Sequence, residues 1–210
     1  MQTIIQAVVL RNVGLEPIRL SLYTPLYGRL TVHDMRRKKQ WQEAIVGDIC
    51  YASLAAQGNR WFLYDLESVV TRVAGADMGS FFWQNHVLDM YFYYVPLQQP
   101  SGDLFSLLIQ VLRISAAPDI VFKLFVAHFF SLLGYHVPEQ LRWYRQVLGQ
   151  IELHGLEQGI DPQLKMELEV THAHSVELLD QWLMSMVVQH DHFHYLKTQN
   201  FLNQLYRIAG

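Results

Sequence analysis

The chain has 210 residues, of which 51% are apolar and 17% charged. This composition supplies enough apolar surface for a folded core and excludes an intrinsically disordered chain. The net charge of −3 conceals an asymmetry, because residues 1–75 carry nine basic and six acidic side chains while residues 76–210 carry seven basic and thirteen acidic ones, so different partners are expected for the two parts.

The sequence predicts neither a secretory signal nor a membrane span. Residues 1–11 alternate like a strand and lack the apolar core of a signal peptide. The most apolar run, 120–135, is shorter than the roughly 18–20 residues that a membrane span needs, and it contains Lys123. The single cysteine, Cys50, can form no internal disulfide and suits a reducing compartment. We therefore expect a cytoplasmic protein.

Residues 1–76 show the period-two pattern of short strands. Apolar and polar side chains alternate in the runs 18–23 and 29–33, which places the apolar ones on one face of each strand. Turn signals separate the runs at Asn12–Gly14, Thr24–Gly28, Gly47–Asp48 and Gly58–Asn59. Five or six short strands are too few for a sandwich of two full sheets, but they are enough for a small closed barrel.

From about residue 77 the apolar pattern becomes helical. One apolar segment ends at Pro96, the next has a period near 3.6 between 104 and 112, and a third runs from 120 to 133 and stops at Gly134. Further helices are predicted at about 139–153, 162–188 with a break, and 196–208. The prediction is thus a multidomain protein, with an all-β barrel in residues 1–76 and an all-α helical domain in residues 77–210.

Several segments match, in their order and spacing, the motifs of one known family. In the first domain these are QAVVLRN (6–12), LSLYTPLYGRLTV (20–32), the basic run MRRKK (35–39) and WFLYDLESV (61–69). In the second they are PSGDLFSLLIQVL (100–112), FVAHFFSLLGYHVPE (125–139) and, more weakly, HYLKTQNFLNQLY (194–206). Over about 150 residues the chain resembles the RecO family of bacterial DNA-repair and recombination mediators.

The resemblance implies a fold and a function. The barrel is expected to be an OB-fold, and the protein to bind single- and double-stranded DNA and to anneal strands. The implied partners are RecR and the C-terminal tail of single-strand-binding protein, and the implied outcome is the loading of RecA onto DNA. Because the sequence contains no G-x-x-x-x-G-K-[ST] phosphate loop and no convincing catalytic constellation, we expect neither enzymatic activity nor a cofactor.

The chain departs from the family pattern in two places. Many family members insert a four-cysteine zinc finger after the L-G-Y-x-P helix, and with Cys50 alone this chain cannot bind that metal. Where the family usually has Lys-Gly before an Arg-Arg pair, this chain has Asp34-Met35, which subtracts charge and removes a flexible glycine. A second hypothesis therefore stays open: a diverged RecO-like fold that acts mainly as a protein-interaction module with weak or no DNA binding.

The barrel also has residues suited to DNA without reference to the family. Proteins bind single strands through a cationic groove that follows the phosphates and through aromatic faces on which bases stack. Aromatic side chains and His33 are interleaved with the cations in this part of the chain, namely Tyr23, Tyr27, Tyr51 and Trp61. The predicted nucleic-acid-binding residues are Arg29, Arg36, Arg37, Lys38, Lys39, Trp41 and Arg60. The competing interpretation is a solvated basic loop beside ordinary strand aromatics.

Two smaller sets of residues complete the predictions. Arg113, Phe122 and Lys123 combine cations with an aromatic ring and could accept the acidic, Phe-ended tail of single-strand-binding protein, although an ordinary helix surface would show the same pattern. His190, His192 and His194 form a cluster that could hold a metal in a metal-dependent enzyme. Their spacing does not fit one helical face, so we favour a polar helix junction and expect no metal.

Overall fold

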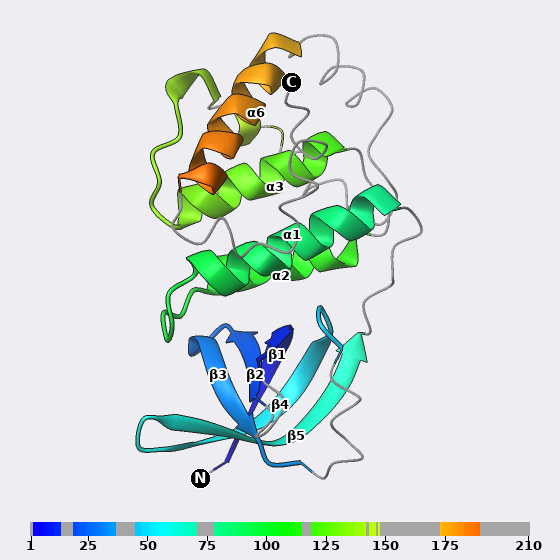
Figure 1. Cartoon of the computed structure of the whole chain (residues 1–210), viewed down its shortest axis with the longest axis vertical. Coiled ribbons are helices and arrows are strands. Elements are labelled where there is room, and N and C mark those ends of the chain that lie inside the picture. Colours follow the sequence, from blue (N-terminus) through cyan, green and yellow to red (C-terminus); the bar gives the residue numbers. More distant parts are fainter. Residues whose placement is uncertain are drawn as a thin grey trace. The chain divides into compact units, whose positions relative to one another are not determined.

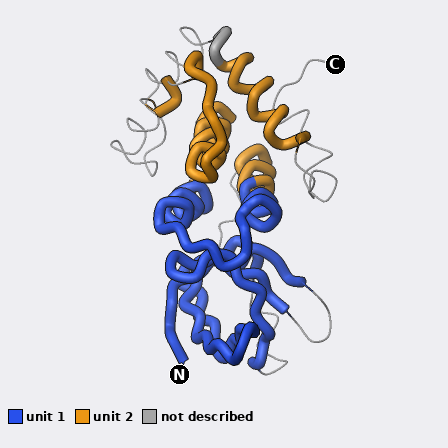
Figure 2. Tube along the Cα trace, turned by 90° about the vertical axis from the view of Figure 1, so that its left-hand side faces the viewer, with its two compact units in different colours: residues 1–74, 87–112 blue, residues 75–86, 113–210 orange. Residues whose placement is uncertain are grey.

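The structure is a computed structural model of the chain (Figure 1). It describes residues 2–13, 19–36, 45–70, 78–114, 119–141, 143–145, 147 and 173–189. Two compact units can be distinguished, and Figure 2 colours them separately. The first comprises Met1–Ala74 with Val87–Leu112, and the second comprises Gly75–His86 with Arg113–Gly210.

Five strands form a closed barrel in the first unit. Around the barrel the order is β1-β2-β3-β5-β4, and every pairing is antiparallel except that of β3 with β5. This order is compatible with an OB-like barrel, and the predicted arrangement of a small barrel followed by helices is confirmed. The strands are β1 (Thr3–Asn12), β2 (Arg19–Thr24), β3 (Gly28–Asp34), β4 (Ile49–Gln57) and β5 (Arg60–Val70).

The barrel interior follows the predicted alternation. Leu20 and Leu22 of β2 point inward together with Leu30 and Val32 of β3, and Cys50 of β4 is fully buried beside them. The residues between these positions lie on the outer face of the barrel, as a period of two requires. The other interior residues are Ile5, Ala7, Val9, Ala52, Leu54 and Leu63, with Tyr27, Trp61 and Leu66 partly buried against them.

The turn between β2 and β3 requires its glycine. The Thr24 hydroxyl accepts a hydrogen bond from the Tyr27 amide at 3.0 Å and donates one to the Gly28 carbonyl at 3.3 Å. Gly28 has φ +66°, and a Cβ atom there would lie 2.2 Å from the backbone oxygen of Gln99. Only glycine fits both the positive φ and this close approach.

The helical part of the first unit packs against the barrel. It consists of the second half of α1 (Met78–Tyr94) and nearly all of α2 (Gly102–Arg113). The Tyr91 hydroxyl donates to the Leu104 carbonyl at 2.6 Å and so joins the two helices. The predicted domains, 1–76 and 77–210, group this segment with the other helices, so the compact units and the predicted domains divide the chain differently here.

The second unit contains the first half of α1, α3 (Asp119–Leu132), the 3-10 turn η2 (Glu139–Leu141) and α6 (Ala173–Val188). As predicted, the helix does not continue past Gly134: α3 ends at Leu132, Gly134 has φ +88°, and the Tyr135 amide donates to the Phe130 carbonyl at 3.0 Å. Of the predicted helix at 139–153, the structure shows η2 and a helical stretch at 143–145. Of the predicted segment 162–188, it shows α6; residues 162–172 and the predicted helix 196–208 lie outside the described residues.

In the described part of the chain, none of the helices combines the length and the apolar character that crossing a membrane requires.

Candidate nucleic-acid interface

Four side chains form a partly exposed row across β2, β3 and β5 on the outer face of the barrel. Arg19 is the cross-strand neighbour of His33, which in turn is the neighbour of Phe62. The rings of His33 and Phe62 are stacked, with centroids 5.5 Å apart and planes 28° apart. Arg60 precedes Phe62 by two residues on the same strand and is exposed at the β4–β5 turn. We call Arg19, His33, Arg60 and Phe62 the outer row.

The outer row has the two properties that bind single strands. Arg19 and Arg60 are exposed cations, and no described residue forms an ion pair with either. Between them, the stacked rings of His33 and Phe62 offer an aromatic surface that stays half-exposed. A groove with cations beside an aromatic platform can bind phosphates and bases without reading sequence.

Arg60 is the predicted site residue that joins this row, and Arg29 is held elsewhere. Arg29 lies on the outer face of β3, as predicted, but its Nη1 donates to the Phe92 carbonyl and its guanidinium lies 5.3 Å from the centre of the Phe92 ring. Burial lowers the pKa of Arg29. This guanidinium therefore fastens α1 to the barrel, which the sequence could not indicate because Phe92 is 63 residues away.

Tyr23 is also covered by the helices. Its ring meets that of Tyr91 edge-on at 5.3 Å and stacks on Phe105 at 6.2 Å, and no part of the residue is exposed. Burial raises the pKa of its hydroxyl. The interpretation of Tyr23 as a stacking platform for bases is thus inconsistent with its position, because its outer strand face is covered by α1 and α2.

Arg36 forms a buried ion pair with Asp34, one of the two residues that depart from the RecO pattern. Its Nε donates to Asp34 Oδ1 at 3.0 Å and its Nη2 to Oδ2 at 2.7 Å. Arg36 is 4% exposed and Asp34 6% exposed. The carboxylate therefore cancels one of the four charges of the basic run, and Arg36 is not placed to meet a phosphate. The rest of the predicted loop set, Arg37, Lys38, Lys39 and Trp41, lies outside the described residues.

The residues predicted for a protein tail do not form a common exposed surface. Phe122 is fully buried and stacks on Trp83, with ring centroids 5.9 Å apart and planes parallel to within 1°. Lys123 is 1% exposed, and its Nζ donates to Asp180 Oδ2 of α6 at 2.8 Å. Only Arg113 is exposed. The sequence did not indicate that Phe122 and Lys123 are buried, because α3 is buried on most of its circumference and the partner of the lysine lies 57 positions away.

The sequence reasoning overlooked Arg19 and Phe62. Arg19 occupies an outward position in the alternating run 18–23, so its face could have been inferred from the sequence. Phe62 lies between Trp61 and Leu63, and three apolar residues in succession hide the alternation of this strand. What the pattern could not supply was the pairing of β3 with β5, which joins the two halves of the row. The histidine cluster at 190–194 lies outside the described residues.

Comparison with known proteins adds no assignment: no family model matches the chain, and no curated protein matches it.

Proposed function

We propose that this chain is a RecO-like mediator of DNA repair and recombination, which binds single- and double-stranded DNA and anneals strands with its barrel. The observation that carries the proposal is the outer row, which combines two exposed arginines with a stacked aromatic pair on an OB-like barrel. The motif resemblance to the RecO family supports the same function, and it extends the proposal to RecR, the tail of single-strand-binding protein and the loading of RecA.

The charges of the barrel indicate how such binding would work. Asp34 and Arg36 neutralise each other, so DNA affinity depends on Arg19, Arg60 and the remaining cations of the basic run, Arg37 to Lys39. Each phosphate contact releases counterions, so binding weakens steeply with salt and depends little on sequence. Bases stacked on Phe62 would add a contribution that salt does not screen, roughly 1–3 kcal/mol per base.

Fluorescence-anisotropy titration with a labelled single-stranded oligonucleotide at two salt concentrations tests the proposal. We expect saturable, salt-sensitive binding. Arg60→Gln should weaken binding and lower the salt slope by about one, because it removes one phosphate contact. Phe62→Ala should weaken binding by a factor of about 5 to 150 that is nearly independent of salt.

A matched aromatic control is available on the same barrel. Tyr51 was among the aromatic residues predicted to accompany the cations, but it is exposed on β4, where its cross-strand neighbours are Gln6 and Glu67 and no member of the outer row. Tyr51→Ala should therefore leave DNA binding unchanged. Equal losses for Tyr51→Ala and Phe62→Ala would show that the outer row is not the interface. A folded protein with no salt-sensitive binding would favour the protein-interaction module instead.

A further inference from the structure

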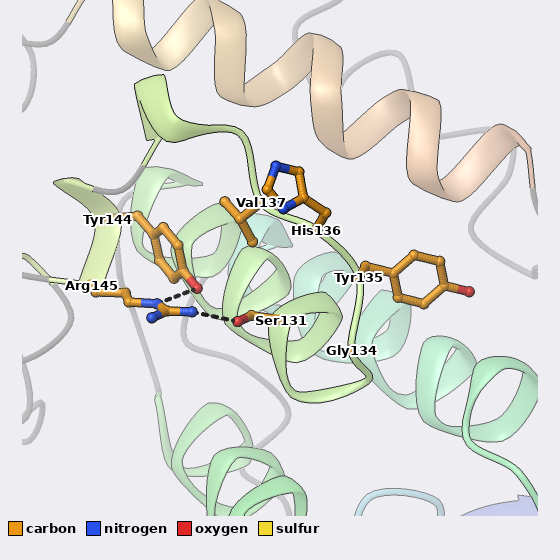
Figure 3. Close-up of a pocket in the computed structure, with 7 residues that line it drawn as sticks. All are labelled: Ser131, Gly134, Tyr135, His136, Val137, Tyr144 and Arg145. Atoms are coloured by element: carbon orange, nitrogen blue, oxygen red, sulfur yellow. Dashed lines mark hydrogen bonds between the residues drawn. The ribbon is translucent and has the colours of Figure 1, made fainter.

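A small cavity lies at the end of α3 in the second unit, and none of the outer-row residues lines it. Its volume is about 380 Å³, a size suited to a small ligand. Figure 3 shows the side chains around it, with Arg145 and Tyr144 grouped on one side and Tyr135 pointing away from them. The lining residues are Ser131, Gly134, Tyr135, His136, Val137, Tyr144 and Arg145.

Two hydroxyl groups hold Arg145 in place. Its Nε donates to the Tyr144 hydroxyl oxygen at 3.2 Å, and its Nη2 donates to Ser131 Oγ at 3.0 Å (Figure 3). Within the described residues, Arg145 makes no contact with a carboxylate. The guanidinium is thus fixed by neutral partners, and its positive charge is not neutralised by them.

The same two bonds leave donors free at the cavity. A hydroxyl whose oxygen accepts from a guanidinium must direct its own proton elsewhere, and neither the Ser131 nor the Tyr144 hydroxyl donates to any described residue. Tyr144 is completely buried, so its hydroxyl anchors the guanidinium without facing a ligand, whereas Ser131 is half-buried and Arg145 is exposed. Arg145 Nη1 has no acceptor among the described residues. The exposed imidazole of His136 adds a further polar group.

A cationic, donor-rich cavity selects its ligand by charge and by the number of acceptor oxygens. A carboxylate offers two acceptor oxygens and one charge, whereas a phosphate monoester offers three terminal oxygens and a charge close to −2 at neutral pH. The unspent N–H groups of the fixed guanidinium, together with the Ser131 hydroxyl, match the second better. We propose that this cavity is a binding site for a phosphate monoester, which Arg145 and Ser131 contact while Tyr144 holds the guanidinium in position. The inference does not depend on the function proposed for the barrel.

Isothermal titration calorimetry on the full chain with phenyl phosphate tests the site directly. We expect binding of one equivalent, with benzoate and diphenyl phosphate binding at least about tenfold more weakly, because each lacks one charge and one acceptor oxygen. Arg145→Gln should reduce affinity for phenyl phosphate by about tenfold or more. Arg145→Lys keeps the charge but cannot contact both hydroxyls, so its affinity for phenyl phosphate should lie between those of the unmodified protein and Arg145→Gln.

Three variants separate a built site from general charge attraction. Without changing charge, Ser131→Ala removes one donor to the ligand and Tyr144→Phe removes one anchor of the guanidinium, and each should weaken binding about three- to tenfold. Arg113→Gln removes an exposed cation that does not line the cavity, and it should leave phenyl phosphate binding unchanged. Far-ultraviolet circular dichroism confirms the fold of each variant, and the conservative Ser131→Ala keeps the test valid if another variant fails to fold.

The source of the phosphate can be distinguished in the same experiment. If the ligand is the end of a nucleic-acid strand, a 5′-phosphorylated tetranucleotide binds more tightly than phenyl phosphate, and Arg145→Gln removes its advantage over the 5′-hydroxyl form. If the ligand is a small molecule, phenyl phosphate binds more tightly than either tetranucleotide. The proposal is overturned if phenyl phosphate shows no saturable binding, if benzoate binds as tightly, or if Arg145→Gln and Arg113→Gln behave alike.

Discussion

Two of the barrel glycines with positive φ, Gly28 and Gly58, provide a controlled test of the packing between β3 and the segment that joins α1 to α2. Gly28 and Gly58 have φ +66° and +58°, so an alanine at either position adopts the same unfavourable backbone conformation. Around Gly58 a Cβ atom would meet nothing within 4 Å, whereas at Gly28 it would lie 2.2 Å from the Gln99 backbone oxygen. The two substitutions therefore differ mainly by one steric clash.

The expected magnitudes follow from these geometries. Gly58→Ala should lower the free energy of unfolding by about 1–2 kcal/mol, the cost of placing an L side chain at positive φ. Gly28→Ala carries the same cost and a further 1–3 kcal/mol or so, because the obstacle is backbone and cannot rotate away. The predicted total is about 2–5 kcal/mol for Gly28→Ala.

Urea unfolding followed by circular dichroism measures both values. The Gln98 amide donates to the Arg29 carbonyl at 2.9 Å beside Gly28, so the variant should also lose amide-exchange protection at Gln98. If Gly28→Ala and Gly58→Ala destabilise the protein equally, the close approach of Gln99 to β3 does not exist in solution and the reasoning fails.

Three further predictions concern buried polar groups. Asp180→Asn removes the carboxylate that pairs with the buried Lys123 and should cost about 3–5 kcal/mol in urea unfolding, whereas Glu177→Gln, an exposed change on the same helix, should cost less than about 0.5 kcal/mol; equal effects would contradict the ion pair. Complete burial lowers the pKa of His86 to about 3, so the unfolded state binds the extra proton between that pKa and the ordinary value near 6.5, and stability should fall with decreasing pH in this window by up to about 1.4 kcal/mol per unit. The stability that depends on neutral His86 is fully present above pH 6.5. The slope of stability against pH should diminish in His86→Gln, and an unchanged slope would show that His86 is not the group responsible. Burial raises the pKa of the Cys50 thiol, which donates to the Ala7 carbonyl at 3.4 Å, so a thiol reagent at pH 8 should react only after unfolding, and rapid reaction of the folded protein would contradict its burial.

Local patterns predicted the barrel well because the alternation of apolar and polar residues within a strand shows which side chains point inward and which point outward. Leu20, Leu22, Leu30 and Val32 point inward as their spacing requires, and α3 stops just before Gly134, where the glycine predicted a stop. These features depend on residues within a few positions of one another. Such short-range rules determine element type without any knowledge of the partner element.

The candidate site was harder to predict because its residues depend on distant partners. Tyr23 and Arg29 have the pattern of exposed strand residues, yet Tyr91 and Phe92 cover them from a helix more than 60 positions later. Lys123 looks like a surface cation until Asp180 is placed beside it. A sequence pattern gives the direction of a side chain from its own strand or helix, but not what occupies the space it enters.

The bridge between Arg29 and Leu97 has a practical consequence for dividing the chain into fragments. A fragment ending at residue 76 would lack the helical segment that covers Tyr23 and Arg29. Both side chains would then be exposed to solvent and would add a partly apolar surface that favours non-specific association. The smallest fragment that retains the packing of the first unit therefore extends to residue 112. Binding measured on a shorter fragment would report on a surface that the whole chain does not expose.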